Sequence, residues 1–220
     1  MDGQSAALDD LVDTQRHAPN RVEYRLLLRV ELQLGGMMDR TSIFAGSPLH
    51  QRPEFLKLNP AGKIPVLVDG DLVLTESVAI VLYLAEKYRD KGFLPADLRQ
   101  RAELNRWLLF AVTELEQPLW RISKHTALYP EERRLPGDVV LASEEFKAMA
   151  AVVAAHLERR SFVLGDDVSV ADFVLAYTLD WGGEAKLLGD FPNLRAYVER
   201  MYARPRAPQR IADAFASLRS

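Results

Sequence analysis

The sequence predicts an α/β N-terminal part followed by an all-helical part. Two short apolar runs, 64–68 and 72–74, flank an Asp69-Gly70 pair that is typical of a type I′ hairpin turn. Directly after them, apolar residues recur at helical spacing until about residue 89. This order of strand, tight turn, strand and helix defines an α/β unit, and the chain beyond it shows helical periodicity in one long segment after another.

The helical part begins after a linker over 89–98, RDKGFLPADL, which contains Gly92 and Pro95. Three prolines, at positions 118, 130 and 136, are expected to break up the region that follows the first long helix. We therefore expect a first domain over 1–88 and a helical domain over 99–220. The expected helices are 22–34, 53–58, 75–89, 99–116, 139–157, 170–181 and 187–203, and a further strand is expected over 41–45.

Composition excludes several classes of function. The chain has 220 residues, a formal net charge of −3 and no cysteine. Without cysteine there is no protein thiol nucleophile, no redox dithiol and no Cys-ligated zinc, so any thiol chemistry needs a thiol that the ligand brings. Four scattered histidines make a metal site unexpected, and the near-neutral charge argues against nucleic acid as a partner.

No membrane contact is expected either, because no window approaches the ~18 apolar residues of a membrane span. The acidic start MDGQSAALDDLVD does not resemble a signal peptide, so we expect a cytoplasmic protein.

The chemistry concentrates between Ile64 and Ser77. Proline at position 65 follows Ile64 at a bend, where a cis peptide bond is expected, and it leaves the backbone groups of Ile64 free to pair outside the sheet. Glu76 and Ser77 begin a helix, where free N–H groups favour a carboxylate. Ser77 can donate to that carboxylate while Glu76 accepts from an ammonium, as an amino-acid head group requires. The alternative is that Thr75 and Ser77 only cap the helix.

The motif P-E-F-L-x-L-N-P-x-G-K-I-P-V-L-x-D-G-D-x-x-L-x-E-S-x-A-I, from Pro53 towards Tyr88, resembles the thioredoxin-like half of soluble glutathione transferases. The resemblance implies that this part has the thioredoxin-like fold and that glutathione is the co-substrate. It also implies that Ile64 and Pro65 pair with the cysteinyl part of glutathione, and that Glu76 and Ser77 hold the γ-glutamyl head group.

The resemblance also assigns residues outside that stretch. His17 to Asn20, HAPN, resembles the loop that joins the first strand to the first helix in a bacterial branch of the family, where a serine follows to activate the sulfur. This chain has Arg21 there, so its catalytic loop is atypical and the catalytic group is unknown, with Asn20 and Arg21 as the candidates. In theta- and phi-like members a histidine at the place of His50 contacts the glycine carboxylate, and Lys63 is placed to help; His50 as a solvated loop residue is the alternative.

Large aromatic residues in the helical part are candidates for the electrophile site. Trp107, Phe110 and Trp120 could line a cavity for an apolar co-substrate, although a role in the core is the favoured interpretation. Ser169 and Asp172 have capping-box spacing ahead of an apolar helix that we expect to be central and buried.

Three functions follow from these observations. The first is a homodimeric transferase that conjugates the glutathione thiol to a small apolar electrophile, without a metal. The second is a catalytically weak binding or assembly module that keeps the fold, which the missing serine favours. The third is a glutathione-dependent isomerase, dehalogenase or reductase, although reduction through a mixed disulfide with the protein is excluded because the chain has no cysteine.

Overall fold

The computed structural model describes residues 53–205 and 207–217, and we confine the structural description to them. These residues belong to two compact units. Residues 53–77 and 213–217 form part of one unit, and the described residues between 78 and 212 belong to the other, which we call the helical unit. The predicted helix 22–34 and strand 41–45 lie outside the described residues, as do Asn20, Arg21 and His50.

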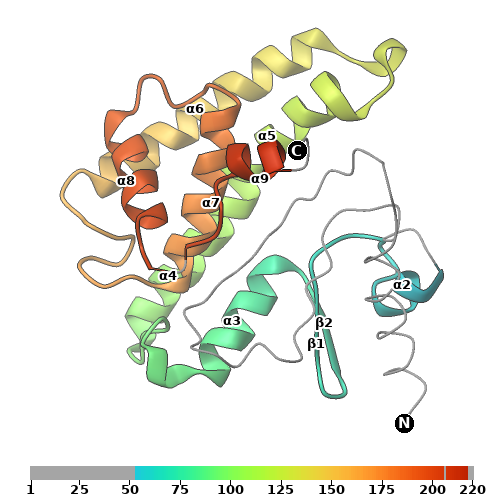
Figure 1. The fold of residues 1–220 in the computed structure, drawn as a ribbon. Coiled ribbons are helices and arrows are strands. Elements are labelled where there is room, and N and C mark those ends of the chain that lie inside the picture. The colour runs from blue at the N-terminus through green and yellow to red at the C-terminus, as the bar shows by residue number, and fades with distance from the viewer. Residues whose placement is uncertain (1–52, 206, 218–220) are drawn as a thin grey trace. The chain divides into compact units, whose positions relative to one another are not determined.

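A hairpin and a short helix make up the described core of the first unit (Figure 1). Helix α2 (Pro53–Leu58) leads through a loop to strands β1 (Val66–Asp69) and β2 (Leu72–Thr75), which pair antiparallel from Val66 opposite Thr75 to Asp69 opposite Leu72. The turn is therefore Gly70-Asp71, one residue later than the sequence predicts. Of these two residues only Gly70 has a positive φ, 64°, which fits a type II′ turn rather than the predicted type I′.

The helical unit is built from helices that are joined by loops of varied length (Figure 1). Single-turn helices lie at Arg89–Lys91 and Glu131–Arg133. Within the described residues the other elements are α3 (Ser77–Lys87), which belongs to this unit from Val78 on, α4 (Leu98–Phe110), the π-helical turn η3 (Ala111–Leu115), α5 (Glu116–Ser123), the π-helical turn η4 (Lys124–Leu128), α6 (Pro136–Leu157), α7 (Val170–Glu184) and α8 (Pro192–Tyr202). Helix α9 (Ile211–Ser217) begins in this unit but belongs to the first unit from Asp213 on.

Pro118 does not break the chain, contrary to the prediction. It lies inside α5, and the helical path continues from α4 to η4. The wider π-turn η3 comes directly before α5, and such a turn can absorb a residue that lacks an N–H group. Two side chains pair with backbone carbonyls around this turn: the Thr113 hydroxyl donates to Leu109 O at 2.9 Å, and Gln117 Nε2 donates to Val112 O at 3.2 Å.

Helix α7 is the centre of the helical unit, as its apolar sequence predicts. Most of its residues are buried, among them Leu175 and Leu179, and it packs against α4, α5 and α8. The predicted capping box of Ser169 and Asp172 is present at its start. Among the predicted boundaries that are wrong, two are starts of helices: α6 begins at Pro136 and α8 at Pro192, because proline suits the first helical position, where its missing N–H costs nothing.

The close approach of Phe146 in α6 to Gly182 in α7 leads to a prediction for two adjacent glycines. A Cβ at Gly182 would lie 2.3 Å from Cζ of Phe146, which is fully buried, whereas the nearest neighbour of a Cβ at Gly183 would be 3.8 Å away. We expect Gly182→Ala to lower the free energy of unfolding by about 1–3 kcal/mol through overpacking. Gly183→Ala, the matched control, should be neutral or add up to about 1 kcal/mol, because alanine suits a helix better than glycine.

Urea unfolding followed by circular dichroism measures both variants, with equal m-values confirming that only stability has changed. Similar midpoints for the two variants would mean that Phe146 moves aside at no cost.

Candidate functional site

The hairpin register brings the predicted ligand-binding residues together at one end of the sheet. Val66 and Thr75 form the last pair of the ladder, so the residue before Val66 and the residue after Thr75 leave the sheet at the same end. These residues are Pro65 and Glu76. The predicted cis peptide bond between Ile64 and Pro65 is confirmed.

Main-chain groups at this end are available to a ligand. Within the described residues no hydrogen bond is recorded for the N–H or the C=O of Ile64, and Pro65 has no N–H to give. Both residues are partly exposed. Because an unpaired polar group next to a sheet end can extend the pairing to another chain, an extended peptide could bind there as an additional strand.

Glu76 occupies an unusual backbone conformation at the junction between β2 and α3. Its φ is 68°, in the left-handed region that few residues other than glycine adopt, and the residue is exposed. Ser77, which is half-buried, is the first residue of α3. Free N–H groups at such a helix start and the helix dipole favour an anion, while the Glu76 carboxylate favours a cation. Opposite charges of a zwitterionic head group can therefore be accommodated side by side.

The alternative interpretation, that Thr75 and Ser77 only cap α3, finds no hydrogen bond to support it. Within the described residues no side-chain hydrogen bond is recorded for either of them. Of the other predicted site residues, Lys63 is exposed on the loop between α2 and β1.

The aromatic candidates of the helical unit fall into two groups. Trp107 is only 2% exposed and makes an edge-to-face contact with Phe110, with ring centroids 5.4 Å apart, and its ring also lies 4.2 Å from that of His156. Trp120 instead packs edge-on against Trp181 at 4.9 Å, and its Nε1 donates to Glu116 at 3.0 Å. The burial of Trp107 favours its role in the core, whereas Phe110 and Trp120 are partly exposed.

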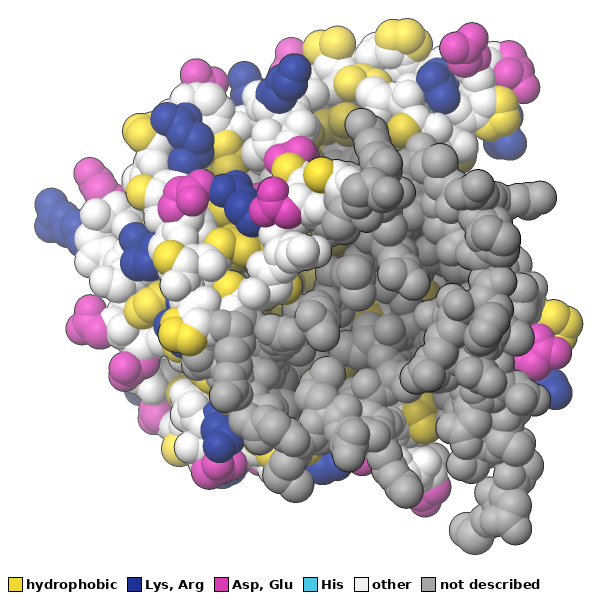
Figure 2. All heavy atoms as spheres, viewed as in Figure 1, with side chains coloured by type: hydrophobic (Ala, Val, Ile, Leu, Met, Phe, Trp, Pro, Cys, Tyr) yellow, Lys and Arg dark blue, Asp and Glu magenta, His cyan; other side chains and the backbone are white. Residues whose placement is uncertain are grey.

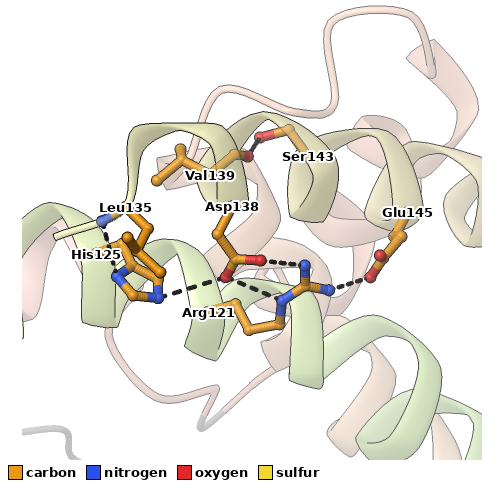
Figure 3. A network of polar contacts seen from close by, with 7 residues as sticks. All are labelled: Arg121, His125, Leu135, Asp138, Val139, Ser143 and Glu145. Carbon is orange, nitrogen blue, oxygen red and sulfur yellow. Dashed lines mark hydrogen bonds and ion pairs between the residues drawn. The ribbon is translucent and has the colours of Figure 1, made fainter.

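A polar network between α5, η4 and α6 has the residue types of an active site but the geometry of a structural link (Figure 3). Arg121 donates to both carboxylate oxygens of Asp138 and also to Glu145, and these hydrogen bonds hold the pKa of Asp138 below its ordinary value. His125 Nε2 lies 3.4 Å from Asp138, while its Nδ1 accepts from the N–H of Leu135 at 3.2 Å. Because both ring nitrogens are engaged, His125 has no free nitrogen to act as a base.

Asn59 and the hydroxyl of Tyr177 are among the buried polar groups that were not predicted as site residues. Asn59, only 6% exposed, organises the loop before Ile64 through its side-chain amide. The Asn59-Pro60 pair is a recognisable turn signal, so this role could have been found in the sequence. The hydroxyl of Tyr177 is buried and has no hydrogen-bond partner among the described residues, and burial raises the pKa of this hydroxyl, so that it stays protonated. No local sequence signal marks that position.

The described residues contain neither a metal-binding cluster nor a membrane-spanning helix. No group of three or more His, Cys, Asp or Glu there could hold a metal ion. None of the helices in that part of the chain combines the length and the apolar character that crossing a bilayer requires. On the face shown in Figure 2, acidic and basic side chains are interspersed over the helical unit.

Comparison with known proteins identifies the family. The sequence profile described as "Glutathione S-transferase, N-terminal domain" matches residues 45–86, and that described as "Glutathione S-transferase, C-terminal domain" matches residues 126–205. Glutathione S-transferase 1 of Dianthus caryophyllus is 34% identical over 200 residues, which cover 84% of this chain and 86% of the relative.

A solved structure and a second relative add to this comparison. The theta class glutathione S-transferase of Xanthomonas axonopodis pv. citri, solved with glutathione bound, is 27% identical with a TM-score of 0.62, covering 71% of this chain and 75% of that one. Elongation factor 1-gamma 3 of Oryza sativa subsp. japonica is 29% identical over 88% of this chain but only 47% of its own length.

The fold is therefore that of a thioredoxin-like N-terminal domain followed by a helical C-terminal domain. The chain belongs to the glutathione S-transferase family. The predicted fold class and the predicted enzyme class, glutathione transferase, are thereby confirmed.

Proposed function

We propose that this protein binds glutathione at the open end of the hairpin and conjugates the glutathione thiol to a small apolar electrophile. One observation carries the proposal: the register places the main chain of Ile64, which has no hydrogen-bond partner in the described part of the chain, near Glu76 and Ser77. This arrangement combines a peptide-pairing edge, a carboxylate and a helix start, and a γ-glutamyl peptide has complementary groups for all three.

In this proposal each end of the tripeptide has its own partners. Glu76 accepts from the γ-glutamyl ammonium, and Ser77 donates to the neighbouring carboxylate. Ile64 with Pro65 receives the cysteinyl part, and Lys63 and His50 contact the glycine carboxylate.

The sulfur and the electrophile complete the site. A free thiol has a pKa near ~8.5, so the protein must favour the thiolate to be effective at neutral pH. We propose that Asn20 or Arg21 stabilises the thiolate, Asn20 by donating a hydrogen bond to the sulfur and Arg21 by its positive charge. Of the aromatic candidates, Phe110 and Trp120 are partly exposed and are proposed for contacts with the electrophile, whereas Trp107, being buried, is left to the core. We further propose a cytoplasmic homodimer of the bacterial branch, with domains over 1–88 and 99–220 and the linker over 89–98, which acts without a metal.

Glutathione binding is tested by replacing the serine at the start of α3. We expect Ser77→Ala to weaken glutathione binding by roughly 1.5–3 kcal/mol, because the serine hydroxyl donates to a charged group. Ser169→Ala is the matched control: it removes the capping hydroxyl of α7 and should lower stability by about 0.5–2 kcal/mol while leaving affinity unchanged.

Titration calorimetry gives the two affinities and chemical unfolding gives the two stabilities. An unaltered dissociation constant in Ser77→Ala would contradict the assignment of the γ-glutamyl end. A loss of affinity in Ser169→Ala would contradict the purely structural role of that cap.

A binding or assembly module without efficient catalysis is the second candidate. It is favoured by arginine at position 21, where the family pattern has serine, and by the similarity to an elongation factor subunit. Steady-state turnover of an aromatic electrophile distinguishes the two, since a module of this kind binds glutathione but conjugates it no faster than the uncatalysed reaction.

A further inference from the structure

We infer that Asn59 is a positioning residue that aims the N–H of Ile64 at the ligand; this inference rests on the glutathione binding proposed above. Asn59 follows α2 and is a buried polar side chain in the first unit. It makes no proposed contact with the ligand. Its effect passes through the backbone of the loop that ends at Ile64.

Asn59 closes that loop with both its side chain and its backbone. Its Oδ1 accepts from the N–H of Ala61 at 3.1 Å, and its Nδ2 donates to Lys63 O at 2.6 Å. Its own C=O accepts from the N–H of Gly62 at 2.9 Å, and its N–H donates to Phe55 O at 2.9 Å, which ties the loop to α2. The loop is therefore held by one residue at several points.

The hydrogen bond to Lys63 O has a geometric consequence for the next residue. Lys63 C=O and Ile64 N–H belong to one planar trans peptide, in which the two groups point in opposite directions. Because Asn59 holds the carbonyl towards itself, the N–H of Ile64 must point away from the loop interior. That N–H is unpaired within the described residues, so it remains available to a ligand.

An N–H group can only donate, so its partner in glutathione must be an acceptor, and in the cysteinyl part that acceptor is the carbonyl oxygen. Peptide orientation alone decides whether this bond forms. If the amide of Asn59 is lost, the peptide between Lys63 and Ile64 can rotate, and the ligand loses a donor although no residue that touches it has changed. This makes Asn59 a residue that tunes affinity from outside the site.

Two variants remove the donor while keeping the acceptor for Ala61. Asn59→Asp has the same shape but places a carboxylate oxygen against Lys63 O. Asn59→Ser can still accept through its hydroxyl but is too short to reach Lys63, and it serves as the uncharged second variant. Asn193→Asp is the matched control, because Asn193 Nδ2 likewise donates to a backbone carbonyl, Ala154 O at 2.9 Å, within the helical unit.

Two ligands that differ in the cysteinyl carbonyl isolate the hydrogen bond between this oxygen and the N–H of Ile64. γ-Glutamylcysteinamide has the cysteinyl carbonyl, and γ-glutamylcysteamine lacks that carboxamide but keeps the head group and the thiol. For the wild type and for Asn193→Asp we expect the first ligand to bind about fivefold more tightly, which corresponds to one neutral hydrogen bond. For both Asn59 variants the ratio should fall below about twofold, with glutathione itself weakened about fivefold.

Calorimetry with these ligands and with glutathione separates the outcomes. If both Asn59 variants bind glutathione as tightly as the wild type and keep the wild-type ratio between the two γ-glutamyl ligands, the positioning role is overturned and the proposed function still stands. Weaker binding of both ligands with an unchanged ratio would make Asn59 a general support of the fold, which also overturns it. If the wild type binds none of the ligands, the proposed function fails and this inference fails with it.

Discussion

Replacing Asp172 with alanine is expected to lower the free energy of unfolding by about 3–5 kcal/mol, because several buried donors would lose their acceptor at once. Asp172 is fully buried at the start of α7. Its carboxylate accepts from the N–H of Val163 at 2.7 Å, from the N–H and the hydroxyl of Ser169 at 2.8 Å each, and from the hydroxyl of Tyr197 at 2.8 Å. Alanine would leave these donors buried without an acceptor.

Burial raises the pKa of Asp172, and the donors around it oppose that rise, so the cost of burying the charge is offset in part within the network. The matched control is Asp167→Ala, an exposed aspartate in the turn just before α7, which should change stability by no more than about 0.5 kcal/mol. Chemical unfolding of both variants measures the difference. Equal midpoints would show that the network around Asp172 contributes nothing net.

Replacing Glu76 with glycine is expected to separate affinity from stability. Glycine adopts a φ of 68° without the penalty of a Cβ, so the free energy of unfolding should rise by up to about 1 kcal/mol. The stabilising effect of the Glu76 carboxylate at the start of α3 is lost and is subtracted from this gain. Glutathione binding should weaken by about 3 kcal/mol, because the bond that is lost joins a carboxylate to an ammonium. In the proposed function, the positive φ of Glu76 is the cost of placing its carboxylate against the ligand.

Lys186→Gly provides the control for backbone strain alone. Lys186 has a φ of 61° after α7 and is exposed, so this change should also stabilise the fold by about 1 kcal/mol, while glutathione affinity stays the same. Calorimetry and chemical unfolding on the two variants give both quantities. If Glu76→Gly binds as tightly as the wild type, Glu76 does not hold the ammonium.

Local signals account for what the sequence predicted well. The hairpin, the helix after Ser77 and the capping box depend on residues within a few positions of one another, and so does the cis bond before Pro65. These features bring the proposed glutathione residues to one end of a sheet, and therefore the described part of the site could be outlined from the sequence.

The errors arose where distant contacts or alternative local geometries decide the structure. Pro118 was expected to break the helix, but a π-turn before it absorbs the missing N–H, and no sequence pattern announces such a turn. Tyr197 reaches Asp172 from α8, across 25 positions of sequence, which short-range patterns cannot show. In the hairpin, both type I′ and type II′ fit an Asp-Gly-Asp sequence, and the strand register selects the second.

The hairpin turn also gives the protein a place to carry a reporter. Gly70 and Asp71 are exposed at the end of the two strands that lies opposite Pro65 and Glu76. Strands of this length separate the two ends by roughly 10–13 Å, at about 3.3 Å a residue. Since the chain has no cysteine, a single one introduced as Asp71→Cys would be its only thiol, and a fluorescent dye could be attached there selectively. The label would be close enough to sense the ligand and too far away to occupy its place.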